Sequence, residues 1–307
     1  MSYSVGLIGC GRWGRNILRD LRKLGCDVHV CDSDSIACEV ALSEGASSAC
    51  SSIDSLPEAL MGFIVATPTV NHFDALYNLL PKQKPIFCEK PLTSEFLSAQ
   101  KLVEIDNNQI FLMDKWRYHP GVQALADLVS QGELGAVQQI RTRRVQWGQP
   151  HSDVDGVWIL LPHDLAIVHH ILGYMPQPQS VVADYSAENM DGLLAILGNK
   201  EQTKAIVEVS SRQPSSDRLI SVSFEKGVAW LADPLDDHIC VYYKMPGTEI
   251  DPDTYEKIPI STDWPLWLEL KGFVEYLNGG SAPLTNAELA TQHVELIEQL
   301  RLMAEAN

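Results

Sequence analysis

The first third of the chain alternates short, continuously apolar runs with amphipathic stretches. The apolar runs lack the polar–apolar alternation of a strand that is exposed on one face. A strand that is apolar throughout is buried on both faces, as in a parallel sheet covered by helices on either side. The alternation therefore predicts strands over 4–9, 27–32, 46–50, 61–67, 85–90 and 109–114, and helices over 13–24, 35–44, 71–80 and 94–106.

The first predicted strand ends in the sequence GCGRWG, which holds Gly9, Gly11 and Gly14. A G-x-G-x-x-G motif between a strand and a helix is typical of a dinucleotide-binding turn. The first glycine permits the tight turn, the second lets the backbone approach a pyrophosphate, and the third lets helix and strand pack closely. Arg12 and Trp13 lie within the motif and are further candidate cofactor contacts. The motif predicts a doubly wound Rossmann sheet.

Asp32 ends the second predicted strand, 18 residues after Gly14. A carboxylate at this place accepts hydrogen bonds from the ribose hydroxyls of NAD and repels the extra phosphate of NADP. No Arg or Lys directly follows Asp32 to reverse that preference. The alternative is a simple turn residue, but the spacing favours NAD as the cofactor, with NADP less favoured.

The charge of the chain excludes some classes of partner. The 307 residues carry a formal net charge of −17. Residues 1–119 hold 11 basic and 14 acidic side chains, and residues 120–307 hold 12 and 26. Such a surface repels phosphate groups, so neither nucleic acid nor an anionic membrane is an expected partner.

Cysteine usage and hydropathy indicate a cytoplasmic protein without a metal. None of the seven cysteines forms a C-x-x-C pair. Several lie in apolar runs, where a thiol behaves as a small hydrophobe, and a reducing compartment fits this usage. Neither a signal peptide nor an apolar run of about 18 residues is evident, so we expect no membrane span.

Five segments of the chain, in this order, resemble the glucose–fructose oxidoreductase / inositol dehydrogenase / MocA family: GLIGCGRWG, VATPTVNHFDAL, CEKPL, KWRYHPGVQALADLVSQGELGAV and PLTNAELATQHVELIEQL. The resemblance implies an NAD-binding domain, expected over 1–119, and a substrate-binding and oligomerisation domain of α+β type, expected over 120–307. The second domain of this family is a large, mostly antiparallel open sheet. β-rich runs over 137–260, interrupted by a helical stretch over 158–172, agree with that expectation.

Two terminal helices are predicted near 264–278 and 286–304, and the last is a candidate to pack back on the first domain.

The resemblance also implies roles for individual residues. Lys90 matches the lysine of the family's E-K-P signature, which stabilises a developing alkoxide and helps to relay a proton. A surface lysine is the alternative. His163 matches the family's acid/base histidine. The expected cofactor contacts at strand ends and after the sixth strand are Thr67, Pro68, Asn71, His72, Glu89, Lys90, Trp116 and Arg117.

The sequence around His163 departs from the family in one position. The family often has an Asp four residues before the histidine, where this chain has Ile159. Asp164 follows His163 directly and is a candidate catalytic partner, although consecutive helical residues point about 100° apart. Asp155 is the other candidate, and loss of the partner is the third possibility.

Two other interpretations of His163 stay open, a satisfied core histidine and a metal ligand with Asp164, His169 or His170. His170 shares its helical face and is expected to pack or to support the site, whereas His169 is expected to be peripheral.

Arg141, Arg143 and Arg144 form a basic cluster in an acidic domain. In a strand, the first two share one face and Arg144 takes the other. The cluster could bind a phosphate or a carboxylate of the substrate. Ion pairing with carboxylates of the same domain is the favoured alternative.

Together these features predict an NAD-dependent oxidoreductase that acts on a hydroxyl or keto carbon of a sugar, a sugar nucleotide or a similar polyol. We expect a homodimer or homotetramer. The rivals are an NAD-retaining glycosidase or lyase that oxidises its substrate transiently, and a non-catalytic NAD-binding regulatory protein.

Overall fold

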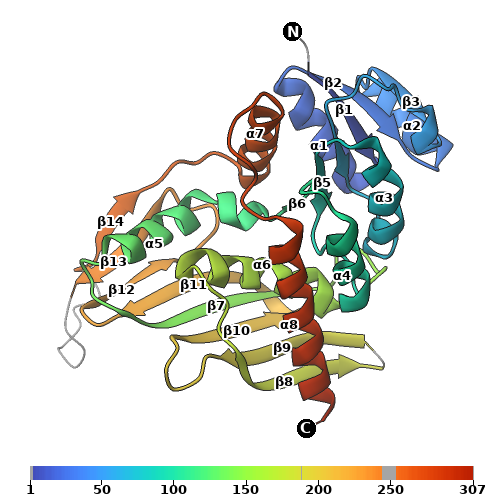
Figure 1. Cartoon of the computed structure of the whole chain (residues 1–307). Helices are drawn as coiled ribbons and strands as arrows, with labels where there is room; N and C mark the ends of the chain where they lie inside the picture. The colour runs from blue at the N-terminus through green and yellow to red at the C-terminus, as the bar shows by residue number, and fades with distance from the viewer. Residues whose placement is uncertain (1–2, 188, 244–253, 307) are drawn as a thin grey trace. The chain divides into compact units, whose positions relative to one another are not determined.

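The computed structural model describes residues 3–187, 189–243 and 254–306, so the stretch 244–253 of the predicted β-rich region lies outside it. The chain forms two compact units (Figure 1). The first unit consists of Met1–Lys115 and Leu266–Glu295, and the second of Trp116–Pro265 and Leu296–Asn307. The units therefore divide at Lys115, a few residues before the boundary expected from the sequence, and the first of them includes a segment from near the C-terminus.

The first unit is built on a six-stranded parallel sheet in the order β3-β2-β1-β4-β5-β6. This is the strand order of a doubly wound dinucleotide-binding domain, and it confirms the predicted fold. All six predicted strands are present: β1 (Tyr3–Ile8), β2 (Cys26–Cys31), β3 (Ser48–Cys50), β4 (Gly62–Val65), β5 (Ile86–Glu89) and β6 (Ile110–Met113).

Helices cover both faces of this sheet because its strands are apolar on both sides. On one face, α1 (Arg12–Lys23), α2 (Ser35–Ser43) and α7 (Pro265–Leu277) contribute to one apolar core. α3 (His72–Leu79) and α4 (Phe96–Ile105) pack on each other, and α3 also packs on β4 and β5. Short 3-10 turns η1 to η4 span Ile53–Ser55, Thr69–Asn71, Leu80–Lys82 and Lys115–Tyr118.

The second unit is built on an eight-stranded sheet in the order β14-β13-β12-β11-β7-β10-β9-β8, and among its described strands the β10–β7 pair alone is parallel. The predicted large, mostly antiparallel open sheet is confirmed. Its strands are β7 (Val137–Trp147), β8 (Pro178–Ser186), β9 (Asn189–Leu197), β10 (Lys204–Ser210), β11 (Arg212–Phe224), β12 (Gly227–Leu231), β13 (His238–Tyr243) and β14 (Glu256–Pro259).

Helices α5 (Pro120–Gln131) and α6 (Gly156–Leu172) lie against one face of this sheet (Figure 1). The strands alternate accordingly: in β9 the side chains of Leu193, Ala195 and Leu197 are buried, whereas Leu194 and Ile196 are exposed. The last helix, α8 (Ala287–Glu305), begins in the first unit and ends in the second. No helix in the described part of the chain combines the length and the apolarity needed to cross a membrane.

Candidate active site

The turn between β1 and α1 requires glycine at two positions and leaves open space at a third. Gly9 has a φ of +87°, and a Cβ there would lie 2.7 Å from the carbonyl oxygen of Ala66. A Cβ on Gly14 would lie 2.3 Å from the carbonyl oxygen of Gly9, so only glycine lets α1 approach this closely. Around Gly11, in contrast, a Cβ would meet nothing within 4 Å. The backbone N–H groups at the start of α1 therefore border open space in which an anionic group can bind.

A hollow of about 430 Å³ lies at the carboxyl edge of the same sheet. Asp32 lines it, and its carboxylate is oriented by two backbone donors: Cys10 N–H donates to Oδ2 at 2.7 Å and Asp34 N–H to Oδ1 at 2.9 Å. Of the predicted cofactor contacts, the hollow brings together Gly9, Asp32, Thr67, Pro68 and Asn71.

The hollow also contains residues that the sequence analysis missed. Ser51, Ser52 and Asp54 follow β3, and Asn78 comes from α3. The signal for the first three was their place after a strand, because the carboxyl ends of parallel strands meet at one edge of the sheet. β3 is only three residues long, so its end is poorly marked in the sequence.

His72 is buried and joins two loops of this edge. Its Nδ1 lies 2.8 Å from the carbonyl oxygen of Pro91, and its Nε2 lies 3.1 Å from that of Thr67. The ring thus connects the loop after β4 to the loop after β5. This geometry gives His72 a role in holding the loops, whereas direct contact with a cofactor stays a prediction.

Glu89, at the end of β5, is surrounded by groups from three elements. Its carboxylate accepts a hydrogen bond from the indole N–H of Trp13, and its Oε2 lies 3.3 Å from the backbone N–H of Lys90. The ammonium of Lys115 lies 4.6 Å from the centre of the Trp13 ring. Burial raises the pKa of Glu89, and Lys90, Trp13 and Lys115 oppose that rise.

Trp116 and Arg117 belong to the second unit. The Trp116 ring stacks on His119 with 5.0 Å between ring centres, and the Arg144 guanidinium lies 4.2 Å from the centre of the same ring. Arg117 Nε lies 3.5 Å from His170 Nδ1. Burial, followed by the charge of Arg117, lowers the pKa of His170 to about 4, so this ring is neutral near pH 7.

The three histidines of α6 differ in their surroundings. His163 is half-buried, in a helix whose neighbouring side chains are buried. Burial and Arg117 also lower the pKa of His169 to about 4. Within the described residues, no group of three or more His, Cys, Asp or Glu side chains is arranged to hold a metal ion.

Both carboxylates considered as partners of His163 are bound by arginines. Asp164 is 1% exposed, and its Oδ2 lies 2.5 Å from Arg144 Nε. Burial raises the pKa of Asp164, and the charge of Arg144 opposes that rise. Asp155 caps the N-terminus of α6 by accepting from Trp158 N–H, and it pairs with Arg301 at 2.7 Å. A catalytic role for Asp164 stays a prediction, and its ion pair points instead to a structural role.

The basic cluster on β7 divides between two faces, as the strand alternation predicts. Arg144 is buried with Asp164. Arg143, on the other face, forms ion pairs with Glu208 at 3.1 Å and with Asp217. The favoured interpretation, ion pairing within the domain, is confirmed for these two arginines.

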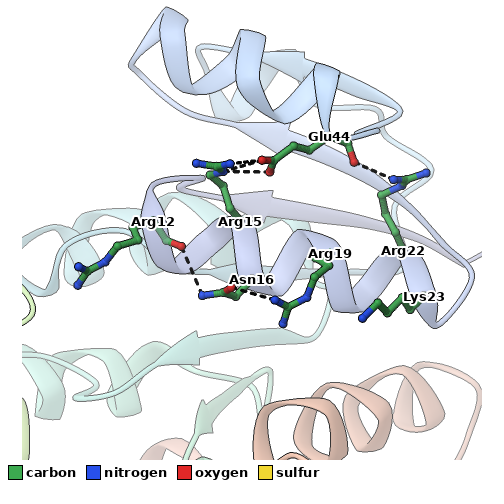
Figure 2. Close-up of a pocket in the computed structure, with 7 residues that line it drawn as sticks. All are labelled: Arg12, Arg15, Asn16, Arg19, Arg22, Lys23 and Glu44. Atoms are coloured by element: carbon green, nitrogen blue, oxygen red, sulfur yellow. Dashed lines mark hydrogen bonds and ion pairs between the residues drawn. The ribbon is translucent and has the colours of Figure 1, made fainter.

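A second hollow, of about 680 Å³, runs along the exposed side of α1 (Figure 2). Arg15 and Arg22 both turn to Glu44, the first through the carboxylate and the second through the backbone oxygen at 2.7 Å. Arg12, a predicted cofactor contact, lines this hollow rather than the one beside Asp32. Arg15 and Arg22 therefore bind acceptors of the protein itself.

Comparison with known proteins agrees with a dinucleotide-binding site beside Asp32. The sequence model of the GFO_IDH_MocA oxidoreductase family, an NAD-binding Rossmann fold, matches residues 3–110. Inositol 2-dehydrogenase 1 of Paenarthrobacter aurescens is 34% identical over 143 residues, which cover 43% of this chain and 42% of that protein. Inositol 2-dehydrogenase of Salmonella typhimurium is 24% identical over 307 residues, which cover 92% of this chain and 88% of that protein.

The matches to three of the curated relatives span only 42% to 51% of their length. The fold comparison covers the whole chain. The solved structure of UDP-N-acetylglucosamine 3-dehydrogenase from Acidithiobacillus ferrooxidans has a TM-score of 0.86 at 20% identity, covering 100% of this chain and 99% of that one. Residues 3–110 therefore carry the sequence pattern of the NAD-binding Rossmann domain of the GFO_IDH_MocA oxidoreductase family, and the whole chain is similar in fold to a dehydrogenase structure.

Proposed function

We propose that the protein is an NAD-dependent oxidoreductase that transfers hydride between the nicotinamide and a hydroxyl- or keto-bearing carbon of a sugar, a sugar nucleotide or a similar polyol. The hollow beside Asp32 carries this proposal. The Asp32 carboxylate accepts hydrogen bonds from the backbone N–H groups of Cys10 and Asp34. It can still accept further hydrogen bonds from ribose hydroxyls. The open space around Gly11 fits a pyrophosphate at the start of α1.

The substrate class rests on the relatives. Their names describe inositol 2-dehydrogenases and a UDP-N-acetylglucosamine 3-dehydrogenase, which act on cyclic polyhydroxylated compounds. We carry over the class and none of the individual substrates.

The residues of the chain divide the chemistry as follows. A bound nicotinamide supplies the hydride acceptor or donor. His163 takes the proton of the substrate hydroxyl in the oxidative direction. Lys90 stabilises the developing alkoxide by its charge and helps to relay the proton. Glu89 lies beside Lys90 and offsets its charge.

The proposal is tested by incubating the protein with NAD and a panel of polyols, sugars and sugar nucleotides. Reduction of NAD is measured by the absorbance of the reduced nicotinamide. On any substrate turned over, Lys90→Met should lower kcat at least about a hundredfold and leave NAD affinity nearly unchanged. Lys84→Met, at an exposed lysine two residues before β5, is the matched control. Equal kcat in the two variants would remove Lys90 from the chemistry.

One observation favours a second candidate function, a non-catalytic NAD-binding protein. Ile159 is 3% exposed, and it is apolar where the family often has an acid. NAD binding without net NADH formation on any member of the panel would favour this candidate.

A further inference from the structure

Glu269 is a fully buried carboxyl that the proposed chemistry does not use. It lies in α7 with 0% exposure, among Leu266, Leu270 and Phe273 of the apolar core. Neither of its carboxyl oxygens has a hydrogen-bond partner among the described residues. An ionised carboxylate in such a place would be very costly, so the neutral, protonated form is the stable one.

The packing of α7 on β5 brings this carboxyl to Glu89. The rings of Phe273 and Phe87 stack with 4.8 Å between their centres. Glu269 lies one helical turn before Phe273, about 6 Å along the helix, and on the same face. Glu89 lies two residues after Phe87, about 6.6 Å along the strand, and also on the same face. Both carboxyls thus belong to the faces that meet at the Phe87–Phe273 stack, and the charge of Glu89 acts on Glu269.

The charged groups around Glu269 come from the ends of two adjacent strands. Burial raises the pKa of Glu269 well above its usual range, the charges of Glu89 and Asp114 raise it further, and Lys115 lowers it. Glu89 pairs in register with Met113, so Asp114 and Lys115 follow directly beside it. Glu89 in turn accepts from Trp13 N–H.

We propose that Glu269 is a positioning residue for Lys90: it remains protonated at neutral pH, and its neutrality keeps Glu89 seated against Trp13 and beside Lys90. Ionisation of Glu269 at alkaline pH places a second negative charge against Glu89, which moves Glu89 away and changes the surroundings of Lys90. The importance of this for catalysis rests on the proposed function, whereas the protonation and the coupling do not.

The first test measures the free energy of unfolding against pH by chemical denaturation without NAD. The pKa of Glu269 is raised in the folded state. Its contribution to the free energy of unfolding is therefore complete at pH values below its pKa in the unfolded chain, and is lost as the pH rises toward its pKa in the folded protein. In Glu269→Gln, the free energy of unfolding should depend on pH less steeply, by the slope that corresponds to one proton. Glu275→Gln changes a more exposed carboxyl on the same helix and should leave the slope unchanged. An unchanged slope in Glu269→Gln would overturn the proposal.

The second test follows modification of Lys90 by an amine-reactive anhydride, read by peptide mass spectrometry. At alkaline pH, Lys90 should react at least about threefold faster in the wild type than in Glu269→Gln, because a Glu89 carboxylate that has moved away no longer stabilises the Lys90 ammonium. Lys84 should react equally in both proteins. Equal rates at Lys90 would overturn the positioning role. A wild type that reduces no NAD with any substrate would count against the proposed function and leave both of these measurements valid.

Discussion

His163 and Asp164 are neighbours in the chain, but their surroundings assign them to different tasks. Asp164 is enclosed with the guanidinium of Arg144, and any protonation of its carboxylate would break a buried pair. His163 is half-buried, and it is therefore less enclosed than Asp164. At the scale of the residue, these surroundings support the proposal that His163, rather than Asp164, is the acid/base.

His163→Asn should therefore abolish most turnover while the fold and NAD binding remain. The pH profile of kcat/KM should lose one limb. His169 and His170 do not contribute to a limb near neutrality, because burial lowers the pKa of each to about 4. Chelators should have no effect. A fall in thermal stability with activity proportional to the folded fraction would instead make His163 a core residue.

Ile159→Asp restores the spacing that the family often has, and it adds a test of the lost partner. A higher rate in this variant would mean that the carboxylate is simply missing. A neutral or harmful effect, with loss of activity in Asp164→Asn or Asp155→Asn, would return one of those two residues to the site.

At the scale of the element, β7 carries two arginines whose pairs should contribute very differently to stability. Removing one partner of the buried Arg144–Asp164 pair leaves an uncompensated charge, so Arg144→Met should cost about 3–5 kcal/mol of the free energy of unfolding. Arg143→Met breaks half-exposed pairs and should cost about 0–1 kcal/mol. Denaturant unfolding of the two variants checks this. Equal losses would contradict the assignment of Arg144 to a buried structural pair.

The elements also mark what the sequence could and could not predict. Apolar runs predicted five of the six parallel strands because burial on both faces leaves a local pattern, whereas β3 is short and only partly buried, and its run is weaker. Helix α5 was not predicted, although Pro120 at its start and Gly132 at its end are standard signals. The partner of Asp164 could not be predicted, because Arg144 is on another element and only the alternation of β7 was readable. Likewise, Glu269 looked like any polar residue of an amphipathic helix until α7 was placed on β5.

At the scale of the whole molecule, the large sheet packs against helices α5 and α6 on one face, and its opposite face carries exposed apolar side chains in the described part of the chain. Val182, Leu194, Glu208 and Arg143 lie in one row across four strands of that face. Val182 is 71% exposed and Leu194 is 41% exposed. Apolar side chains in such a row favour cover by a second copy of the chain, which is the homo-oligomer expected from the sequence.

Light scattering at micromolar concentration should therefore give a multiple of 34.0 kDa. A double variant, Val182→Lys with Leu194→Lys, should shift the mass toward the monomer. Leu97→Lys, at an exposed leucine of α4, is the control and should leave the mass unchanged. A wild-type protein of 34.0 kDa under these conditions would contradict the predicted assembly.

The central claim, an NAD-dependent oxidoreductase, is tested most directly by titrating the protein with NAD and with NADP and following its tryptophan fluorescence. Asp32 should make NAD bind at least about tenfold more tightly than NADP, a difference of about 1.4 kcal/mol. Asp32→Ser should reduce that preference, because it removes the carboxylate that accepts from the ribose and repels the phosphate. NADP binding as tightly as NAD or more tightly, or no binding of either dinucleotide, would contradict the account.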